Sequence, residues 1–590
     1  MAAGLERSPV AVGVTGRRWV WREGEDRVGL GIAQRHTLPE IVGRVMAARG
    51  HDVDSAVHFL EPTLRALLPD PSVLVDMDCA AGRLAHAVQR SETVAVFGDY
   101  DVDGACSTAI LVTVLRALGC PVLHHIPDRL TEGYGPNGPA LLALAGRGAT
   151  LIVCADCGTA AALPLSAVAG QADVLVLDHH VAEGPPPPVW ATVNPNRLDC
   201  ASGLTGLCAA GVAFLAVVAL VRMLRRAGWF ASRPEPDLLG LLDLVALATV
   251  CDVMPLTGLN RALVTQGLRV MTRRTRPGVA ALLDIASVSG PLTAFTCGFA
   301  LGPRINAGGR LGDATMGLRL LLTDDVAEAQ RLAALLDGVN RERQAVEGAM
   351  LDTALAMAAA QGAAGHAAML VYGADWHPGV VGIVAGRIKE RYNRPACVGA
   401  LADGVVRGSG RSVAGVDLGR AIMAARSYGI LLTGGGHAMA AGFSLAVDRL
   451  DDFHAFLNDR LAHAAALPAA ADLAIEGALS VQGATVELAQ GLSRLAPFGH
   501  GNPEPVFMLA RAQVVHAERI GREQNTLRVM VQGEGGGSRL KALLFRAGDG
   551  PLAAALSRNG APLHLAGQLR AEAWNGVTTP SFFITDAAAA

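Results

Sequence analysis

Carboxylate and imidazole side chains follow directly after four apolar stretches of this sequence. The apolar stretches cover residues 93–98, 151–155, 174–177 and 244–251. The polar residues that come after them are Asp99, Asp101, Asp103, Asp156, Asp178, His179, His180 and Asp252. Unpaired carboxylates that lie close together repel one another and shift towards their neutral form. Four such endings therefore indicate a cation-binding site, if the fold brings them together.

The apolar stretches resemble buried strands, and we expect them to belong to one open parallel sheet. Between residues 71 and 285 such stretches alternate with Ala- and Leu-rich helical segments, for example 79–90 and 107–118. This alternation is typical of a parallel α/β sheet. Ligands of such sheets bind beyond the carboxyl ends of the strands. We therefore expect the four polar endings at one edge of the sheet, around one metal site.

Asp99, Asp101 and Asp103 alternate within the string Asp-Tyr-Asp-Val-Asp-Gly. If the chain stays extended here, this spacing turns the three carboxylates to one side, and Gly104 then allows a sharp turn into a helix. An EF-hand calcium loop is excluded, because Ile110 stands where its twelfth position requires glutamate. Oxygen ligands with one imidazole favour Mn²⁺ or Mg²⁺. Five or six donors can hold two such ions, as in enzymes of phosphoryl transfer.

The composition is that of a large, packed protein without a global nucleic-acid signature. The 590 residues are 51% hydrophobic and 17% charged, with a formal net charge of −3. Any nucleic-acid binding must therefore depend on local basic patches. Ten cysteines at this length do not indicate a disulfide framework, and no secretory signal peptide opens the sequence. A cytoplasmic location is expected.

Two segments imitate other functions. Residues 203–221 carry no charge and precede three arginines, as in a membrane span. The segment is mostly Ala, Gly and Val, and we expect a buried core helix instead. Cys154 and Cys157 form a Cys-x-x-Cys pair, but a zinc site needs further ligands at suitable spacing. We expect these two cysteines to be small core residues.

Five regions follow from the changes of pattern along the chain. They are a loosely attached N-terminal leader (1–70), an α/β block (71–323), a long connecting helix (324–361), a smaller glycine-rich α/β block (362–465) and a segment of short strands (466–590). The short strands with Gly-rich turns predict a small β-barrel or sandwich.

Several strings closely resemble the DHH phosphoesterase superfamily. The first block carries Asp178-His179-His180 together with the string 99–104. The second block carries 376–385, 408–412 and 434–442, which are similar to the substrate-binding DHHA1 domain of that superfamily. Three more strings, 131–135, 304–310 and 497–507, narrow the resemblance to its family of single-stranded-DNA exonucleases. The likeness covers roughly residues 70–590, and it departs from the family pattern at Gly308, where alanine is common.

The resemblance implies a role for each polar ending. It implies direct metal ligation by Asp101, Asp103, Asp156, His179 and Asp252. Asp99 is expected to ligate or to lie just outside the ligand shell. Asp178 is expected to orient the histidines, and His180 to contact the scissile phosphate.

Positive charge for DNA is expected in the second block. Ser409 and Arg411 lie in a Gly-Ser-Gly-Arg-Ser string that we interpret as a loop, with free amides that cradle a terminal or backbone phosphate. Gly435, Gly436 and His437 are interpreted as a second tight loop. The resemblance adds further nucleic-acid contacts at Arg129, Tyr134, Arg304, Asn306, Arg310, His377 and Arg387.

The resemblance therefore implies a two-metal exonuclease that degrades single-stranded DNA from the 5′ end to 5′-mononucleotides. Mn²⁺ or Mg²⁺ is the expected cofactor and single-stranded DNA the expected partner, with a helicase and a single-strand-binding protein as further candidates. A monomer without membrane contact is expected. Two alternatives stay open: a phosphodiesterase for short oligonucleotides or cyclic dinucleotides, and a catalytically dead DNA-binding scaffold. The sequence ends soon after the β-rich segment, so contacts through an additional C-terminal domain are not expected.

Overall fold

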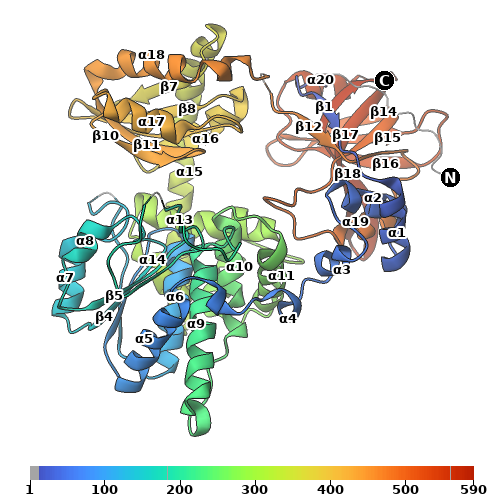
Figure 1. The fold of residues 1–590 in the computed structure, drawn as a ribbon. Helices are drawn as coiled ribbons and strands as arrows, with labels where there is room; N and C mark the ends of the chain where they lie inside the picture. Colours follow the sequence, from blue (N-terminus) through green and yellow to red (C-terminus); the bar gives the residue numbers. More distant parts are fainter. Residues whose placement is uncertain (1–11, 130, 183, 469, 559) are drawn as a thin grey trace. The chain divides into compact units, whose positions relative to one another are not determined.

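The computed structural model describes residues 12–129, 131–182, 184–468, 470–558 and 560–590. The chain divides into two compact units (Figure 1). We call His58–Arg343 with Pro497–Pro503 the parallel-sheet unit, and Met1–Val57, Gln344–Ala496 and Glu504–Ala590 the second unit.

The parallel-sheet unit contains a sheet of five parallel strands in the order β3-β2-β4-β5-β6. The strands are β2 (Val94–Phe97), β3 (Val122–His125), β4 (Leu151–Ala155), β5 (Asp173–Leu177) and β6 (Ala191–Val193). Phe97 pairs with Cys154, and Ala155 pairs with Leu177, so three of the polar endings leave one edge of the sheet together. The prediction of a parallel α/β sheet with acidic strand ends is confirmed for these three stretches.

The fourth apolar stretch is not a strand, and this prediction was wrong. Residues 244–251 belong to helix α10 (Leu242–Cys251), and Asp252 caps its carboxyl end. All side chains from Leu244 to Ala248 are fully buried. A helix buried on every side is apolar all round. Its sequence therefore shows no period that would distinguish it from a buried strand.

Helices pack on both faces of the parallel sheet. In chain order, the helices of this unit are α3 (Ser55–Leu60), which begins in the second unit, α4 (Leu64–Leu67), η1 (Pro71–Val73), α5 (Met77–Arg90), α6 (Val102–Ala117), α7 (Gly138–Gly146), α8 (Ala162–Ser166), α9 (Ala209–Arg226), η2 (Trp229–Ala231), η3 (Leu239–Leu241), α10, α11 (Gly258–Thr272), α12 (Pro277–Ile285), the π-helix η4 (Thr296–Leu301), α13 (Gly302–Leu311) and α14 (Thr315–Leu322). The unit has a hydrophobic core on each face of the sheet. In strand β2, Val94 and Val96 belong to the larger core, and Ala95 and Phe97 belong to the smaller one.

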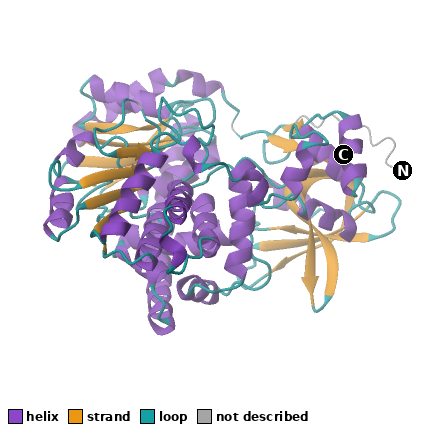
Figure 2. Cartoon of the chain, turned by 60° about the horizontal axis from the view of Figure 1, so that its bottom comes forward, coloured by secondary structure: helices purple, strands orange, loops and turns teal. Residues whose placement is uncertain are grey.

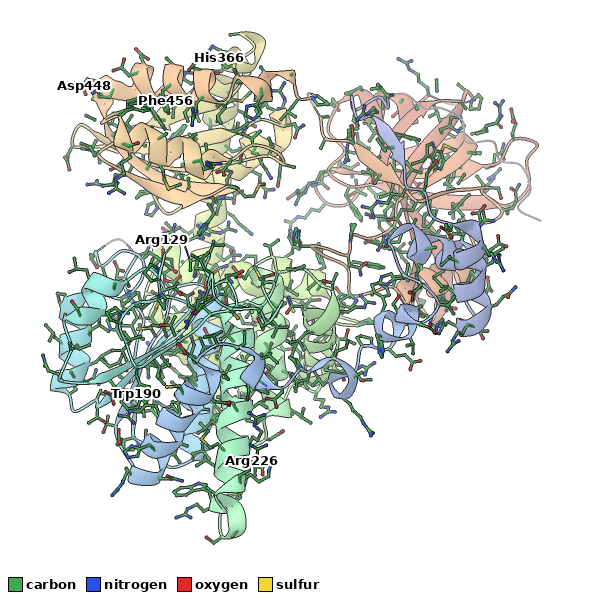
Figure 3. All side chains as sticks on the ribbon, viewed as in Figure 1. Arg129, Trp190, Arg226, His366, Asp448 and Phe456 are labelled. Carbon is green, nitrogen blue, oxygen red and sulfur yellow. The ribbon has the colours of Figure 1, made fainter. Side chains whose placement is uncertain are left out.

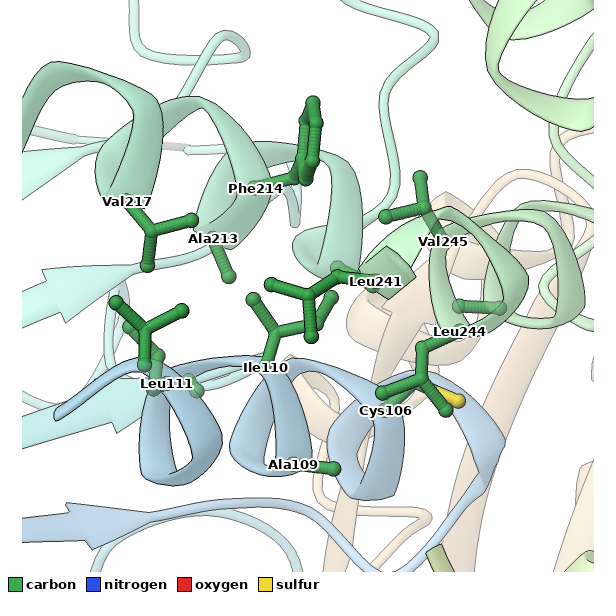
Figure 4. Close-up of a cluster of buried hydrophobic side chains, with 14 of the residues drawn as sticks. Cys106, Ala109, Ile110, Leu111, Ala213, Phe214, Val217, Leu241, Leu244 and Val245 are labelled. Atoms are coloured by element: carbon green, nitrogen blue, oxygen red, sulfur yellow. The ribbon is translucent and has the colours of Figure 1, made fainter. Parts of the chain in front are cut away.

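Helix α9 lies in the larger core, where its apolar face meets α6 and α10. Figure 4 shows Ala213, Phe214 and Val217 of α9 beside Ile110 and Leu111 of α6. The expectation of a buried core helix within 203–221 is thus confirmed. Among the described residues no helix is long and apolar enough to cross a membrane. Cys154 and Cys157 are both free and buried, as expected of core residues.

One helix, α15 (Val326–Ala363), runs for 38 residues and contributes to both units. The predicted connecting helix is therefore present. Its first half adds Leu332 and Leu336 to the larger core of the parallel-sheet unit. Its second half adds Met350 and Ala354 to a core of the second unit.

The second unit contains a five-stranded mixed sheet in the order β10-β11-β9-β8-β7. Its elements are β7 (Met369–Gly373), α16 (Val381–Tyr392), β8 (Ala396–Ala402), β9 (Val405–Arg411), α17 (Leu418–Ser427), β10 (Thr433–His437), β11 (Ala440–Ala446), η5 (Val447–Arg449), α18 (Leu450–Arg460) and η6 (Ala462–Ala466). Only β7 and β8 run parallel among the described pairings of this sheet.

The C-terminal strands form the predicted barrel, beside which Figure 2 marks the C-terminus; all strands are orange in that view. Five strands close on themselves in the order β14-β15-β16-β18-β17, because β17 also pairs with β14. The elements of this region are β12 (Leu473–Ile475), β13 (Gly477–Leu479), α19 (Val486–Ser493), β14 (Phe507–Ile520), β15 (Thr526–Gln532), β16 (Arg539–Leu544), α20 (Pro551–Leu556), β17 (Pro562–Trp574) and β18 (Val577–Ala589).

The N-terminal segment is not loosely attached, in contrast to the expectation. Strand β1 (Trp19–Trp21) pairs with β12, and α1 (Asp26–His36) packs on α2 (Glu40–Ala48). The indole of Trp19 is buried and donates to Asp586 Oδ2 at 2.9 Å. Sequence did not predict this attachment, because β1 is only three residues long and pairs with a strand that lies far away along the chain.

Candidate metal centre and nucleic-acid contacts

The acidic string 99–103 is shaped by the start of helix α6. Asp101 is the N-cap residue, and its Oδ1 accepts from the amides of Asp103 and Gly104 at 2.9 and 3.1 Å. The expected extended segment through Asp103 was wrong, because an aspartate N-cap satisfies the free amides of the first turn and starts the helix early. Gly104 is required here, since a Cβ would lie 2.5 Å from the backbone of Asp99.

The carboxylate of Asp103 lies against the amino end of another helix. Its two oxygens accept from the amides of Ala209 and Ala210, the first residues of α9, at 2.7 and 2.8 Å. The positive end of a helix dipole stabilises a negative charge. Burial nevertheless raises the pKa of Asp103, and the charge of Asp101 adds to this increase, although His179 opposes it.

Asp156 follows β4 in the left-handed region, with φ of +65°. A non-glycine residue is uncommon there, and such conformations concentrate at functional sites. The side chain is 2% exposed. Burial raises the pKa of Asp156 well above its usual value, and the neighbouring charges of Asp103 and Asp101 raise it further.

His179 lies between three of these carboxylates. Its Nε2 is 3.3 Å from Asp156 Oδ1, 3.5 Å from Asp252 Oδ2 and 3.7 Å from Asp103 Oδ2. Two donors that share one ion at about 2.1 Å each are separated by about 3 Å or slightly more. Burial lowers the pKa of His179, which favours the neutral imidazole that a metal requires. The geometry is that of a metal-ligand cluster.

Three carboxylate oxygens in this cluster are buried without a hydrogen-bond partner among the described residues: Asp99 Oδ1, Asp156 Oδ1 and Asp252 Oδ2. Such groups are costly unless something pairs with them. Burial, together with the charges of Asp103 and Asp101, raises the pKa of Asp252 to about 9. For Asp99, burial and then Asp101 raise the pKa well above the usual range.

The donor set fits hard divalent cations such as Mn²⁺ and Mg²⁺. Candidate ligand atoms within 4.8 Å of one another form three groups: Asp103-His179-Asp252, Asp99-Asp101-Asp156 and Asp156-His179-His180. The groups share Asp156 and His179, which is the arrangement that two neighbouring ions need. The structure therefore brings together every residue that the sequence predicted for the metal site.

Asp178 lies behind the histidines rather than among the metal donors. Its Oδ1 accepts from His180 Nδ1 at 2.7 Å and from the His179 amide at 2.7 Å, and its Oδ2 accepts from the Thr159 amide at 3.0 Å. Burial alone would raise the pKa of Asp178, but these contacts, first of all His180, hold it below its usual value. Burial likewise opposes the charge of His180, yet Asp178 raises the pKa of that imidazole to about 9.

Two asparagines that sequence analysis missed hold the histidine segment in place. Asn194 Nδ2 donates to the His180 carbonyl at 2.8 Å, and Asn196 Nδ2 donates to the His179 carbonyl at 2.6 Å. Both follow β6 in the string Asn-Pro-Asn. This position, directly after the neighbouring strand of the same sheet, was the signal that could have identified them.

Helix α13 packs against the acidic string. Asn306 Oδ1 accepts from the Val102 amide at 3.1 Å, and a Cβ on Gly309 would lie 2.6 Å from the Tyr100 carbonyl. Arg304 donates to Asp337 at 2.9 Å and to the Ala300 carbonyl at 2.6 Å. Two of the predicted DNA contacts, Asn306 and Arg304, are thus engaged within the protein.

Arg129 and Tyr134 lie near the same edge of the sheet. The Arg129 guanidinium lies 5.1 Å from the centre of the Tyr100 ring. Arg129 follows strand β3, and Figure 3 labels it. The Tyr134 hydroxyl lies 3.1 Å from His180 Nδ1 and 3.2 Å from the Asp156 carbonyl, so this ring is tied to the metal cluster. Arg310 lies on α13.

Ser409 and Arg411 lie on strand β9, so their interpretation as a loop was wrong. Both are paired with β8 and β11, and their amides belong to a sheet rather than to a phosphate cradle. The side chains nevertheless meet, because Arg411 Nη1 donates to Ser409 Oγ at 2.8 Å. A Cβ on Gly382, in the first turn of α16, would lie 3.0 Å from Arg411 Nη2 and 3.1 Å from Ser409 Oγ.

Gly435, Gly436 and His437 also belong to a strand, not to a tight loop. They end β10, which pairs with β11 at the edge of the mixed sheet. Gly436 has φ of +145°, and a Cβ there would lie 2.4 Å from the Ala440 carbonyl. These glycine-rich strings looked like loops because a strand with few side chains lacks the alternation that identifies it.

The two remaining residues that were expected to contact nucleic acid lie near or on α16. His377 precedes the helix, and its Nδ1 accepts from the Gly379 amide at 3.0 Å. Arg387, on the helix, is 3.3 Å from Glu347 and 3.7 Å from Glu390. Arg387 is thus partly neutralised by two carboxylates in its present conformation.

Comparison with known proteins agrees with this architecture. Three family models match: the DHH family N-terminal domain at 93–249, the DHHA1 domain at 364–463 and the RecJ OB domain at 475–586. These matches and the carboxylate–histidine cluster define a phosphoesterase of the DHH class with an appended OB domain.

Individual relatives narrow the class. The single-stranded-DNA-specific exonuclease RecJ of Dickeya dadantii is 39% identical over 530 residues, which cover 86% of this chain and 89% of the relative. RecJ of Escherichia coli is 38% identical over 525 residues, with the same coverage. The crystal structure of Thermus thermophilus RecJ with Mn²⁺ has a TM-score of 0.80 at 32% identity and covers 97% of this chain and 79% of that chain. The chain belongs to the RecJ family.

Proposed function

We propose that this protein is a metal-dependent exonuclease that hydrolyses single-stranded DNA from the 5′ end to 5′-mononucleotides. One observation carries the proposal: Asp156 Oδ1 and Asp252 Oδ2, which are buried without a hydrogen-bond partner among the described residues, lie 3.3 and 3.5 Å from Nε2 of the neutral His179 imidazole. Membership of the RecJ family supplies the substrate, because the relatives are described as single-stranded-DNA-specific exonucleases.

The ligands of two Mn²⁺ or Mg²⁺ ions are, in this proposal, Asp101, Asp103, Asp156, His179 and Asp252, with Asp99 beside them. Bound ions of this kind activate a water molecule and stabilise the leaving oxygen of a phosphodiester. RecJ of Thermus thermophilus has been crystallised with each of these metals. Asp156 and Asp252 would hold the ions with carboxylate oxygens that are buried without a hydrogen-bond partner among the described residues.

The protein's own contribution to the chemistry centres on His180. With a pKa of about 9 it carries a proton at neutral pH and can donate a hydrogen bond to a phosphate oxygen. Asp178 and Tyr134 contact its ring and fix its orientation. Aimed at the scissile phosphate, the imidazolium stabilises the negative charge that grows in the transition state.

The substrate strand is held by the remaining candidates. Ser409 and Arg411 form a pocket for the terminal phosphate, with the first turn of α16 beside them. Arg129, Arg304, Asn306, Arg310, His377, Arg387, Gly435, Gly436 and His437 contribute further contacts to the backbone. For Arg304 and Arg387 this requires that their carboxylate partners be exchanged for phosphate.

Neither alternative function has comparable support. A phosphodiesterase for dinucleotides does not account for a barrel that matches the RecJ OB domain. A dead scaffold predicts lost ligands, and all the expected ones are present. We also propose a monomer that acts in the cytoplasm. Its regions keep the expected bounds 71–323, 324–361, 362–465 and 466–590, whereas the N-terminal segment is attached through β1 and Pro497–Pro503 groups with the parallel-sheet unit. A helicase or a single-strand-binding protein is the expected supplier of substrate.

The test uses purified protein with Mn²⁺ and 5′-labelled single-stranded, double-stranded and dinucleotide substrates. Release of labelled mononucleotides from long single strands is expected, with little product from blunt duplexes. Cleavage of dinucleotides alone would favour the phosphodiesterase. Binding of single strands without any product, at every metal concentration, would favour the scaffold.

A further inference from the structure

A loop from the C-terminal half of the chain belongs to the parallel-sheet unit. Pro497–Pro503 joins this unit, although the residues on either side belong to the second unit. The loop is closed by backbone hydrogen bonds in both directions between Gly499 and Asn502, at 2.9 and 3.2 Å. Asn502 is 1% exposed, and its Nδ2 donates to the Pro497 carbonyl at 2.8 Å. These internal hydrogen bonds give the segment a defined conformation of its own. We call Pro497–Pro503 the plug.

The plug docks on the segment that follows Asp252. The Leu256 amide donates to the His500 carbonyl at 2.8 Å. Gly501 has φ of +73°, and a Cβ there would lie 3.0 Å from Pro255 Cβ. Gly206 also contacts this proline, since a Cβ there would lie 2.9 Å from Pro255 Cγ. Pro255 thus packs closely against two glycines, and a side chain at either one would crowd it.

The contacts to Pro255 bear on the way in which helix α10 ends. The amides of Val253 and Met254 donate to the carbonyls of Val250 and Thr249 at 3.2 and 3.1 Å, which is the Schellman pattern of helix termination. The residue in the left-handed position is usually glycine, but here it is Val253, with φ of +59°. A β-branched residue is a genuine outlier there and persists only where its surroundings enforce the conformation.

The side chain of Val253 does not supply that enforcement, because it is 63% exposed. Three residues contact the backbone of Pro255 and Leu256, which follow Val253. They are His500 and Gly501 of the plug, and Asn260, whose Nδ2 donates to the Pro255 carbonyl at 3.1 Å. The strained residue therefore lies between two fixed points, α10 on one side and Pro255 on the other. Asp252 is the residue directly before it.

We propose that the plug 497–503 is a positioning element for the metal ligand Asp252. By fixing Pro255 and Leu256 it maintains the strained cap at Val253, which keeps Asp252 Oδ2 3.5 Å from His179 Nε2. This inference rests on the proposed function only in that Asp252 ligates a metal. It assigns a role to a motif that the proposed function leaves without one.

The test is a calorimetric titration of the full-length protein with Mn²⁺ in the absence of DNA. Gly501→Ala adds a side chain against Pro255 and should weaken Mn²⁺ binding by about 10-fold or more, the usual effect of losing an outer-shell support. Turnover of this variant should recover at high Mn²⁺ concentration, with an unchanged KM for DNA. Gly521→Ala is the matched control, because Gly521 has φ of +88° and open space around it.

A second substitution separates positioning from mere stability. Val253→Gly removes the strain at the cap, so Gly501→Ala should lose most of its effect on Mn²⁺ affinity in that background. If Gly501→Ala does not fold, Asn502→Asp replaces it, because it exchanges the Nδ2 donor to the Pro497 carbonyl for an acceptor oxygen and so weakens the closed conformation of the plug. Variants that unfold at lower temperature but bind Mn²⁺ like the wild type would overturn the proposal. Wild-type protein that binds Mn²⁺ but leaves DNA intact would contradict the proposed function alone.

Discussion

Asp178 and His180 form a buried carboxylate–imidazole pair, with Oδ1 and Nδ1 2.7 Å apart. Asp178 is separate from the candidate metal donors, because its carboxylate accepts from backbone amides of residues 159, 179 and 180. Its effect is to keep His180 protonated at neutral pH while neighbouring His179 stays neutral. The two adjacent histidines thus differ in charge: protonated His180 suits a phosphate, and neutral His179 suits a metal ion.

The substitution Asp178→Asn should remove the positive charge of His180 at neutral pH. Without the carboxylate the pKa of His180 should fall from about 9 towards the ordinary value of about 6.5. We expect kcat to decrease by about 10- to 100-fold at neutral pH, as for other outer-shell partners. The imidazole titration followed by NMR gives the pKa directly. Asp199→Asn is the control, since Asp199 pairs with Arg197; an unchanged His180 titration in Asp178→Asn would refute the assignment.

Metal affinity should rise with pH. Burial and neighbouring carboxylates raise the pKa of Asp252 to about 9, and they raise that of Asp156 well above its usual value. In the metal-free protein these groups hold protons that a bound ion must displace. Mn²⁺ affinity should therefore increase between about pH 6 and pH 9, with protons released on binding. Calorimetry in buffers of different ionisation enthalpy measures that release, and binding without proton release would contradict the prediction.

The same pKa shifts predict how the stability of the metal-free protein depends on pH. A carboxyl whose folded pKa lies above its unfolded value stabilises the fold fully below the unfolded value, about 4, and loses that contribution as pH rises to the folded value. For Asp252 this window is about pH 4 to 9. Each such group changes the free energy of unfolding by at most about 1.4 kcal/mol per pH unit. Unfolding in the presence of a chelator should thus become easier towards pH 9, and saturating Mn²⁺ should reverse this trend.

Asp156→Ala should abolish turnover while DNA binding is largely retained. The substitution removes a carboxylate shared by two of the candidate ligand groups, but no positive charge. Binding is measured by fluorescence anisotropy with labelled single strands, and turnover by mononucleotide release. Asp173→Ala is the control, because Asp173 begins the neighbouring strand and pairs with Arg83 instead. Near-normal turnover of Asp156→Ala would exclude this metal assignment.

The cluster of candidate metal ligands could be predicted from the sequence more completely than the elements that carry it. Three apolar stretches were recognised as strands, and Asp156 and His179 follow directly from their ends. The fourth stretch is a helix, yet Asp252 still joins the cluster, because a helix end can deliver a side chain to the same edge. The polar residue after each apolar stretch was the informative signal, and it did not depend on the type of secondary structure.

Other parts of the site could not be predicted, because they depend on contacts between distant residues. Nothing in the local sequence of Asp103 indicates that the amides of Ala209 and Ala210 will bind its carboxylate. Arg304 was expected to contact DNA, but Asp337, 33 residues away, pairs with it. The glycine-rich strings near Arg411 and Gly436 were interpreted as loops, although strand pairing engages their backbones.

Gly382→Ala should impair recognition of the 5′ phosphate. The added Cβ would lie 3.0 Å from Arg411 Nη2 and 3.1 Å from Ser409 Oγ, so these two side chains must shift by a few tenths of an ångström from the positions proposed for phosphate binding. We expect KM for 5′-phosphorylated single strands to rise about 10-fold, the effect of one charge-assisted hydrogen bond of roughly 1.5 kcal/mol. Strands with a 5′ hydroxyl should be affected much less. Gly386→Ala is the matched control, because Gly386 lies one turn further along α16 with open space around it. Arg411→Lys should reproduce the loss, since lysine keeps the charge but not the planar pair of donors; equal losses on both kinds of strand would place the terminal phosphate elsewhere.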